Sequence, residues 1–584
     1  MAALWQELRA RSMAANRRRV SAPATSARPL PKRRWHVLAL GLLVLLMALP
    51  GLSSLPVIDR DEARYAQSSV QMVESGDYVE IRLGERPRNK KPIGAYWAQA
   101  AMLNVVGLGA PGERLWAQRL PSVLGGLLAV WLTYLAALPI LGRRGAALAG
   151  TMLATSLLFT FEAHMAKTDA LLLASTTAVF AALARLRAGR LRGAAWLFWI
   201  GLGASVLIKG PVGPAVALLA LAGLWAWERQ LRWARPLLRL LPILVFFAIW
   251  LPWIVSIGLR TDGAFFAESL GRDFGGKLAG AQEDHGGPPG YHLIAIWIGL
   301  WPAALFLLPG AVFAWQAARR GGDSLPARGM RLALAWVVPF WIVLELVPTK
   351  LPHYALPLYP ALCIAMAGAV IAAFGAKRYS GTRWASAIIF LVVSAALLAV
   401  ILSVQAQFGD ADRWWLAIGV AVFAGVCALV AVICTILARM RGAVVAAGLA
   451  AVPLSGITYG VLLPGAAPLS LSQRIVAASP APIVSLFYGE DSLRYYAGTG
   501  NTRFGETVPW HLFETWEGGT LVLDEKRVPG GVAAALASAD EAGVCLFERA
   551  RIRGFNYTRA DEVELVLLGQ EPCPASETAE PAPE

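Results

Sequence analysis

The segment after the first long apolar run carries side chains that can do acid–base chemistry. It reads Asp59-Arg-Asp-Glu-Ala-Arg-Tyr65. Helical spacing places Arg64 and Tyr65 on the same face as Asp61. A carboxylate beside a guanidinium and a phenol can act as a general base or orient a hydroxyl group. An ordinary charged helix start, whose acidic residues favour the N-terminal dipole, explains the pattern equally well, so both interpretations stay open.

A second cluster of cations ends at Lys90 and Lys91, just before the next apolar stretch. Two ammonium groups at the depth of lipid headgroups suit a phosphate carried by a lipid, because such a phosphate cannot enter hydrocarbon uncompensated. General attraction to anionic lipids is the simpler alternative. We therefore expect both lysines to bind a phosphate, with Lys91 the stronger candidate.

Further ionisable side chains stand at the ends of later apolar runs. Such residues are costly near hydrocarbon and usually face a cavity or a partner. Each alone could merely snorkel to the interface or cap a helix, but together the cations oppose the usual charge bias of external loops. The residues are His164, Lys167, Asp169, Lys209, Lys350, His353 and Tyr354.

The loop between residues 260 and 289 is rich in glycine and charge, which predicts a mobile loop or lid over a site. His285 within it and His292 beyond it could hold a divalent metal together with a carboxylate. No recognisable ligand spacing supports that site, and ordinary loop and cap roles are the alternative. The sequence has no phosphate-cradling glycine motif and no cofactor signature, so no cofactor is predicted.

Composition assigns these residues to a membrane protein. The chain of 584 residues is 57% hydrophobic and 16% charged, whereas soluble domains have about 25% charged residues. Between Trp35 and Pro464, apolar runs of roughly 16 to 25 residues recur, which is the length that a helix needs to cross a bilayer. We therefore expect an α-helical polytopic membrane protein with about thirteen transmembrane helices.

The count of spans depends on the short basic loops, which all fall on one side of the membrane only if Ile93–Gly109 does not cross it. We predict that this stretch lies on the membrane surface as an amphipathic helix anchored by Tyr96 and Trp97. Residues 58–117 then form one large external loop. The predicted spans are residues 36–57, 118–140, 145–161, 169–184, 193–208, 211–227, 237–258, 291–314, 332–348, 354–375, 384–406, 414–437 and 442–463.

The net charge of +15 resides in short clusters between apolar runs, which indicates topology signals rather than binding to nucleic acid. A basic segment, residues 1–34, precedes the first span and favours a cytoplasmic N-terminus. An odd number of spans then places the C-terminal region in the periplasm. The expected location is the bacterial inner membrane.

Beyond the predicted transmembrane domain, residues 35–464, the sequence changes character. Residues 465–570 contain strand patterns at 481–488, 520–524, 544–548 and 562–568 with helical patterns between them, which predicts a small periplasmic α/β domain. Cys545 and Cys573 could pair there, although sequence alone does not show that they meet. Residues 571–584, rich in proline, glutamate and alanine, are predicted to be disordered.

Several of these motifs together resemble one family. They are Asp61-Glu-Ala-Arg64-Tyr65, Gly76-Asp77, Lys91-Pro92 with Tyr96-Trp97, Asp169, and Lys350-Leu-Pro-His-Tyr354 followed by Tyr359-Pro360. The pattern resembles the bacterial aminoarabinose transferases of the protein O-mannosyltransferase superfamily. The resemblance implies the GT-C membrane fold and an inverting glycosyltransferase that takes a sugar from undecaprenyl phosphate, a polyprenyl phosphate. The acceptor would be lipid A or another glycolipid or polysaccharide of the envelope.

The resemblance also implies roles for individual residues. Asp61 would be the leading catalytic carboxylate, with Arg64, Tyr65 and Asp169 beside it. Relatives that act on lipid A place a glutamate just before the lysine that Lys91 matches, so Lys90 in this chain indicates a different donor or acceptor. The residues expected to bind substrate are Lys90, Lys91, Tyr96, Lys350, His353 and Tyr354.

Three other functions remain open from the sequence: a flippase or transporter of lipid-linked sugars, a protein O-glycosyltransferase, and a membrane-anchored assembly or sensor protein. A transporter is expected to carry ionisable residues in mid-span and internal repeats. The suggestive residues here cluster instead at one membrane face, which favours the transferase.

Overall fold

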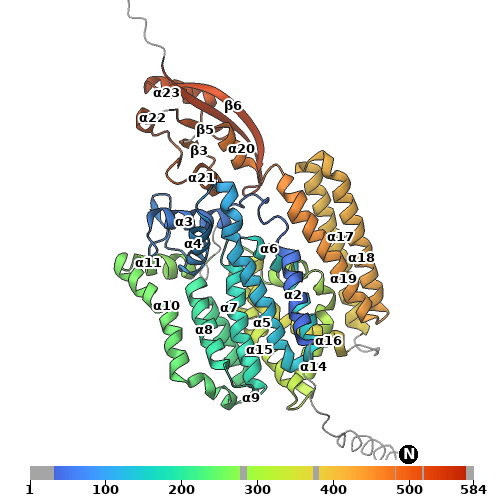
Figure 1. The fold of residues 1–584 in the computed structure, drawn as a ribbon. Coiled ribbons are helices and arrows are strands. Elements are labelled where there is room, and N and C mark those ends of the chain that lie inside the picture. Colours follow the sequence, from blue (N-terminus) through green and yellow to red (C-terminus); the bar gives the residue numbers. More distant parts are fainter. Residues whose placement is uncertain are drawn as a thin grey trace, which may run out of the picture. The chain divides into compact units, whose positions relative to one another are not determined.

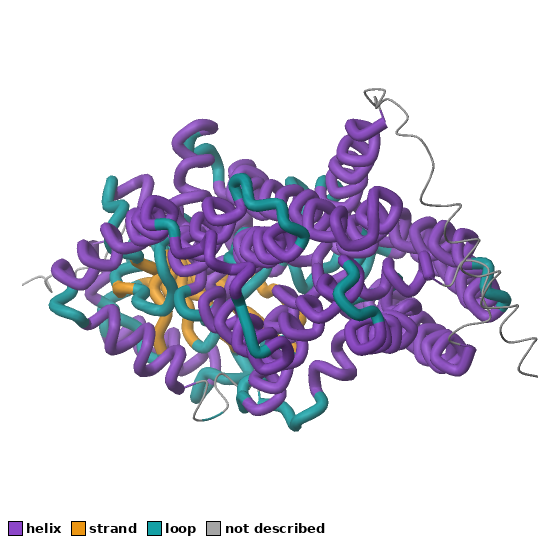
Figure 2. The backbone as a smooth tube through the Cα atoms, turned by 90° about the horizontal axis from the view of Figure 1, so that it is seen from below, coloured by secondary structure: helices purple, strands orange, loops and turns teal. Residues whose placement is uncertain are grey.

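A computed structural model describes residues 32–276, 280, 286–372, 380–479, 482–515 and 518–573. Most of the predicted basic N-terminal segment, residues 1–31, lies outside them, as do residues 574–584 of the predicted tail. Most of the described backbone is helical, and the strands gather in one region (Figure 2).

Apolar helices account for most of the chain before residue 465 (Figure 1). They are α2 (Lys32–Ala48), α5 (Pro111–Ala154), α6 (Leu157–His164), α7 (Asp169–Arg187), α8 (Ala194–Lys209), α9 (Val212–Glu228), α10 (Leu240–Arg260), α13 (Tyr291–Gly299), α14 (Leu307–Arg320), α15 (Leu325–Leu346), α16 (Tyr359–Ala372), α17 (Ser380–Phe408), α18 (Trp414–Ile436) and α19 (Met440–Ile457). Shorter helical turns are η1 (Arg232–Leu238), α11 (Ala264–Phe266), η2 (Ala267–Gly275), η3 (Ala303–Phe306), η4 (Pro352–Leu358), η5 (Ala411–Arg413), η6 (Thr458–Leu462) and η7 (Leu463–Gly465).

The protein is a multi-pass membrane protein. Among the described residues, eight helices are long and apolar enough to cross a bilayer. The pair formed by α13 and the helix Ala303–Arg320 passes the same test together but bends by 117°. Two predicted spans, 118–140 and 145–161, are largely joined in the single helix α5, which breaks at Gly142, where φ is 70°. The predicted number of thirteen spans stays a prediction.

Burial separates the central helix from those that face lipid. The most apolar window of α7 is 89% buried within the protein, whereas those of α10 and α17 are 17% buried. A helix that is apolar on all sides can be buried in the protein or can face lipid, since lipid and protein core are both apolar. The central helix α7 packs against α5 and α8, and its first residue is Asp169.

The predicted external loop folds onto the end of this bundle. It contains α3 (Asp61–Ser75), a hairpin of β1 (Arg82–Leu83) and β2 (Arg86–Pro87), and α4 (Gly94–Val106). The helix expected over Ile93–Gly109 is present as α4, but the prediction that Tyr96 anchors it in the membrane surface is wrong. The ring of Tyr96 is fully buried and stacks on Tyr65, with centroids 4.7 Å apart, because it fills the core between α3 and α4.

The C-terminal region is a small mixed domain with a five-stranded sheet in the order β4-β3-β5-β7-β6. β3 pairs in parallel with β4 and β5, whereas β7 is antiparallel to both β5 and β6. The missed strand is β4, a short edge strand. The elements are α20 (Leu471–Ala478), β3 (Ile483–Leu486), α21 (Asp491–Ala497), β4 (Thr502–Gly505), α22 (His511–Thr515), β5 (Thr520–Asp524), α23 (Gly531–Glu541), β6 (Cys545–Asn556) and β7 (Asp561–Glu571).

A disulfide bond closes this domain. Cys545 at the start of β6 is bonded to Cys573 just after β7, which settles the pairing that the sequence left open. Regular structure extends to Glu571, so the ordered chain runs slightly beyond the predicted boundary at residue 570. The domain contacts the external loop, because α21 packs against α3.

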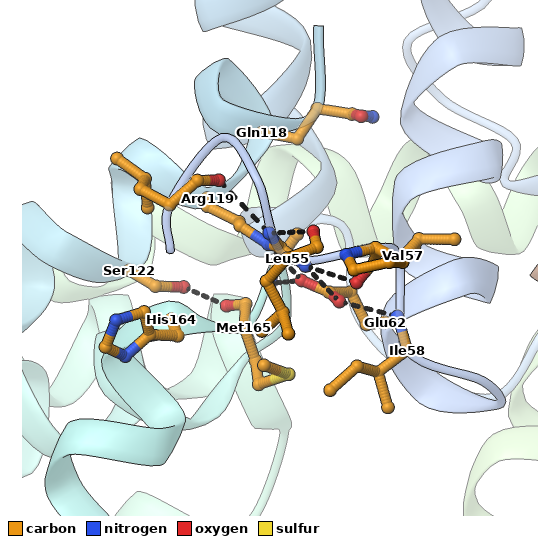
Figure 3. A network of polar contacts seen from close by, with 12 residues as sticks. Leu55, Val57, Ile58, Glu62, Gln118, Arg119, Ser122, His164 and Met165 are labelled. Carbon is orange, nitrogen blue, oxygen red and sulfur yellow. Dashed lines mark hydrogen bonds and ion pairs between the residues drawn. The ribbon is translucent and has the colours of Figure 1, made fainter. Parts of the chain in front are cut away.

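A buried ion pair fixes the start of α3 to the bundle (Figure 3). Arg119 of α5 donates to both carboxylate oxygens of Glu62, at 2.8 and 2.9 Å. Its remaining N–H groups donate to the carbonyls of Leu52, Leu55 and Pro56. Both side chains are almost completely buried, and a buried pair is stable only when its hydrogen bonds are satisfied in this way. We call this contact the Glu62–Arg119 clamp.

Candidate active site

A cavity of about 340 Å³ lies where the external loop, the starts of α7 and η4, and the C-terminal domain meet. Its walls combine acidic, cationic and aromatic side chains from segments that are far apart in the sequence. Eight of the ten residues predicted as catalytic or substrate-binding line it, namely Asp61, Arg64, Tyr65, Lys90, Lys91, Asp169, His353 and Tyr354.

Asp61 occupies the first turn of α3 and is open to the cavity. Among the described residues, the carboxylate of Asp61 has no hydrogen-bond or ion-pair partner, although it lies near the cations Lys167, Arg88 and Arg64. Burial by surrounding protein would raise the pKa of its carboxyl, but Lys167 and Arg88 together hold that pKa below its usual value. Asp61 is therefore an ionised carboxylate available to a ligand.

The carboxylate of Asp169, in contrast, forms ion pairs with neighbouring lysines. Its carboxylate oxygens lie 2.6 Å from the ammonium of Lys209 and 3.7 Å from that of Lys167. The Lys167 ammonium also lies 2.9 Å from Glu162. Because two lysines share two buried carboxylates, the cluster is held together without an exposed partner. Asp169 is thus paired with two cations of the cavity wall, Lys167 and Lys209.

Lys90 and Lys91, the lysines predicted to bind phosphate, also line the cavity. Lys91 forms an ion pair with Asp273 of η2, and the hydroxyl of Ser269 donates to the backbone carbonyl of Lys90 at 3.3 Å. The glycine-rich loop predicted as a lid therefore contributes a short π-helix to this wall. An incoming phosphate would compete with Asp273 for the ammonium of Lys91.

The C-terminal domain completes the cavity. Arg64 donates from Nε to Asp491 of α21 at 2.6 Å, and Tyr557 and Thr558 from the β6–β7 turn line the wall. The hydroxyl of Tyr557 accepts a hydrogen bond from the backbone N–H of Asp59 at 2.7 Å. Sequence reasoning missed these contributors, because nothing in the local pattern of the C-terminal domain indicates where it docks.

An apolar groove of about 170 Å³ continues from the lysine wall. Its polar end is shared with the cavity and contains Lys91, Lys209 and Tyr354. Its other lining is aliphatic and aromatic, contributed chiefly by α15 and α9. A cationic end joined to an apolar groove has the form required by a lipid with an anionic head.

The chain is similar to several known proteins. Residues 90–255 match the family model described as dolichyl-phosphate-mannose-protein mannosyltransferase. An undecaprenyl phosphate-α-4-amino-4-deoxy-L-arabinose arabinosyl transferase from Aeromonas salmonicida is 28% identical over 403 residues, 66% of this chain and 70% of that protein. A protein of the same description from Edwardsiella ictaluri is 30% identical over 366 residues, 60% of this chain and 61% of that protein.

The solved structure of ArnT from Cupriavidus metallidurans bound to undecaprenyl phosphate superposes with a TM-score of 0.68 and 22% identity. The match covers 92% of this chain and 98% of ArnT. The resemblance to the aminoarabinose transferases is confirmed. The fold is that of ArnT, as the motifs indicated, with a GT-C-like helical part and a small C-terminal sheet domain.

Two predicted residues of the aminoarabinose transferase motif stand outside the cavity wall. The ammonium of Lys350 donates to the backbone carbonyls of Leu344 and Glu345, both at 2.7 Å, and so caps the end of α15. The hydroxyl of Tyr96 accepts a hydrogen bond from Arg88 at 3.2 Å behind the wall. In both residues the polar atoms are engaged by protein.

Arg88 is the cation that sequence reasoning missed in this part of the loop. It lines the cavity, and its guanidinium lies over the ring of Tyr65, 5.7 Å from the centroid. The signal was present, because Arg88 belongs to the same cationic run as Lys90 and Lys91. The sequence does not show that Arg88 lies over the ring of Tyr65 and donates to the hydroxyl of Tyr96.

The metal site suggested by two histidines finds no support in the described part of the chain. No group of three or more histidine, cysteine, aspartate or glutamate side chains there could hold a metal ion. His292 is buried, with Nδ1 3.7 Å from Glu345, and it does not line the cavity. His285 lies outside the described residues.

Proposed function

We propose that this protein is an inverting membrane glycosyltransferase that moves a sugar from undecaprenyl phosphate to lipid A or another envelope glycolipid. The relatives it resembles are undecaprenyl phosphate-α-4-amino-4-deoxy-L-arabinose arabinosyl transferases. The observation that carries the proposal is the cavity itself. A carboxylate without a partner among the described residues, Asp61, lies in the same cavity as the lysines at the head of an apolar groove.

The donor fits this cavity in one orientation. Its phosphate would lie at Lys91 and Lys209, and the first part of its polyprenyl chain would follow the groove along α15. The sugar would then project toward Asp61, Tyr65 and Arg88. This orientation separates the hydrocarbon from the charged wall, which is the least costly arrangement for an amphiphile.

The chemistry needs cations more than a general acid. The bond between sugar C1 and the carrier phosphate oxygen breaks as the acceptor oxygen attacks C1 from the opposite face. The carrier phosphate leaves with the electron pair and gains one negative charge, which Lys91, Lys209 and Arg64 are placed to stabilise. A departing phosphate that is stabilised in this way does not have to be protonated.

The role of Asp61 depends on the acceptor. A hydroxyl acceptor must lose a proton, and the carboxylate of Asp61 would accept it. A phosphate acceptor is already a nucleophile and needs only to be positioned. Because nearby cations hold the pKa of Asp61 below its usual value, the residue is a weak base, which favours positioning over proton abstraction.

The proposal includes an orientation and a division into domains. We place the N-terminus in the cytoplasm and the cavity with the C-terminal domain in the periplasm, because the basic loops follow the positive-inside rule. The disulfide between Cys545 and Cys573 suits the oxidising periplasm. The boundaries proposed from the sequence are residues 1–34, 35–464, 465–570 and 571–584.

A transfer assay on purified protein with defined undecaprenyl phosphate sugars tests this function. We expect transfer by the wild type, and a loss of about 10²-fold or more in Lys91→Ala, because a cation at the departing phosphate is removed. Lys526→Ala, an exposed lysine of the C-terminal domain, is the matched control and should retain full activity. Absence of transfer with every sugar tested, or full activity in Lys91→Ala, would refute the proposal.

A further inference from the structure

A second cavity, of about 440 Å³, adjoins the first. Arg64, Arg88 and Lys90 line both cavities and so form the partition between them. The remaining wall comes from the β1–β2 hairpin of the external loop on one side and from α21 and β4 of the C-terminal domain on the other. Apart from Asp491, which holds Arg64, the proposed sugar transfer uses none of these remaining residues.

Cations outnumber acids in the lining of this cavity. Six cationic side chains line it, against three acidic ones. An excess of cations in a confined space repels itself unless an anion enters. The cations are Arg64, Arg86, Arg88, Lys90, Arg494 and Arg503, and the acids are Glu85, Glu268 and Asp491.

The hairpin that carries Arg86 is fixed by the protein, and Arg503 is tied to the same hairpin. Gln71 of α3 exchanges two hydrogen bonds with the backbone of Gly84, at 2.8 and 2.9 Å, and this fixes the hairpin. Gly84 has a φ of 65°, a left-handed conformation that favours glycine, and it lies next to Arg494. Arg503 reaches from β4 to Glu85 of the hairpin at 2.5 Å.

Arg494 is a half-buried cation of this cavity with an incomplete set of partners. One of its terminal nitrogens lies 3.2 Å from Asp491, and its guanidinium lies over Phe504 at 4.7 Å from the ring centroid. Its Nε is buried without a hydrogen-bond partner. Burial lowers the pKa of Arg494, and repulsion from Arg503 and Arg86 lowers it further despite the attraction of Asp491. A buried donor without a partner, among repelling cations, is the condition that a bound anion relieves.

The carrier lipid is a poor occupant of this second cavity. Its phosphate is covalently attached to a long hydrocarbon chain, and the apolar groove suited to that chain opens at Lys91 and Lys209. Neither of those lysines lines the second cavity, whose apolar side chains are Leu83, Pro87 and Phe504. Lys90 alone is shared by the groove and the second cavity, so a phosphate that is not attached directly to a long hydrocarbon chain suits the second cavity better than the carrier phosphate.

We propose that the second cavity binds a phosphate-class anion carried by the acceptor, separate from the acceptor group that attacks the sugar. This inference rests on the proposed transferase function. An anion held by Arg86, Arg494 and Arg503 would leave the attacking group of the same molecule free to pass the Arg64–Arg88 partition toward Asp61. The C-terminal domain would thereby select phosphorylated acceptors.

Binding is tested first, without catalysis. The full chain in detergent is titrated with inorganic phosphate, and separately with a phosphorylated glycolipid and its dephosphorylated form, while thermal unfolding is followed. The test variant is Arg86→Gln/Arg503→Gln, which removes two exposed or half-exposed cations and should fold normally. Arg527→Gln, in the same domain but paired with Asp561, is the matched control.

We expect a rise in Tm on addition of the phosphorylated glycolipid for the wild type and for Arg527→Gln, and a smaller rise for the double variant. Stabilisation by inorganic phosphate that depends on the same arginines would show that the cavity binds a phosphate, and the kinetics below would then decide whether that phosphate belongs to the acceptor. The dephosphorylated glycolipid should have little effect. Equal stabilisation of all three proteins by every phosphate probe would overturn the proposal.

Kinetics then separates acceptor binding from the chemical step. In the double variant, the KM for a phosphorylated acceptor should rise about tenfold, while the KM for the donor stays unchanged, because charged hydrogen bonds to the acceptor alone are lost. An equal rise for the dephosphorylated acceptor would contradict the proposal, as would stabilisation by inorganic phosphate alone with no change in KM. Failure of the wild type to transfer any sugar would refute the transferase function, while the titrations would still decide whether the cavity binds phosphate.

Discussion

Two adjacent carboxylates at the start of α3 have opposite environments. Glu62 is buried and takes part in four hydrogen bonds, from Arg119 and from the backbone N–H groups of Ile58 and Ala166. Asp61 is open to the cavity and has no hydrogen bond among the described residues. Successive residues of a helix point about 100° apart, so one faces the bundle and the other the cavity. The difference shows that one short acidic segment provides both the anchor and the candidate catalytic group.

A third carboxylate in the same segment extends the comparison. Asp59 accepts hydrogen bonds from the backbone N–H and the hydroxyl of Ser492, both at 2.6 Å. It therefore ties the external loop to the C-terminal domain. Within four residues, one acid fixes the loop to the bundle, one ties it to the C-terminal domain, and one remains available to a ligand.

The largest expected effect separates Asp61 from Glu62 by function. We expect Asp61→Asn to lower kcat by about 10²- to 10⁴-fold, the range for loss of a proton-transfer or positioning group, with no loss of thermal stability. Steady-state transfer kinetics and thermal unfolding of the purified variant check this. Wild-type turnover in Asp61→Asn would contradict the assignment of Asp61.

Glu62→Gln should show the reverse pattern. The substitution leaves the buried guanidinium of Arg119 without a charged partner, which should lower the free energy of unfolding by about 3–5 kcal/mol. Thermal unfolding and resistance to protease in detergent measure this effect. Glu74→Gln, at an exposed position of the same helix, should be neutral. A stable Glu62→Gln protein would show that the Glu62–Arg119 clamp is not needed to hold the loop.

Asp491→Asn tests whether the C-terminal domain orients Arg64 in the cavity. Asp491 holds Arg64 at 2.6 Å, and its neutralisation should free that guanidinium and lower kcat about tenfold, the value expected for a charge-assisted hydrogen bond. The KM for the donor should change little. Asp540→Asn on exposed α23 is the control for a change of charge in the same domain. An unchanged kcat would mean that Arg64 does not need this partner.

The last effect concerns the dependence of stability on pH. Burial, and then repulsion from Glu490, raises the pKa of Asp59 from 3.8 to about 7. The folded protein therefore holds a proton that the unfolded chain releases, so the free energy of unfolding should fall as pH rises from 3.8 to about 7 and then level off. Asp59→Asn should flatten this dependence in unfolding experiments at several pH values. Identical slopes in variant and wild type would contradict the raised pKa.

Much of the arrangement was predictable from local pattern. Apolar runs identified the helical membrane part, because the length of a hydrophobic run reports the thickness of the layer it must cross. Of the ten site residues predicted from the sequence, eight line one cavity in the structure. The two exceptions, Tyr96 and Lys350, have polar groups that the fold itself satisfies, and a motif does not distinguish such a residue from one that faces a ligand.

By itself, the sequence determined the membrane-embedded helical fold, the helix that carries Asp61, and the cations that accompany it. Only the tertiary structure decided which of these charges are neutralised. Glu62 meets Arg119 from another helix, Asp169 meets Lys209, and Arg64 meets Asp491 from the C-terminal domain. The reason is physical: the length of an apolar run is a local property, whereas the pairing of charges depends on distances between segments that only the folded chain brings together.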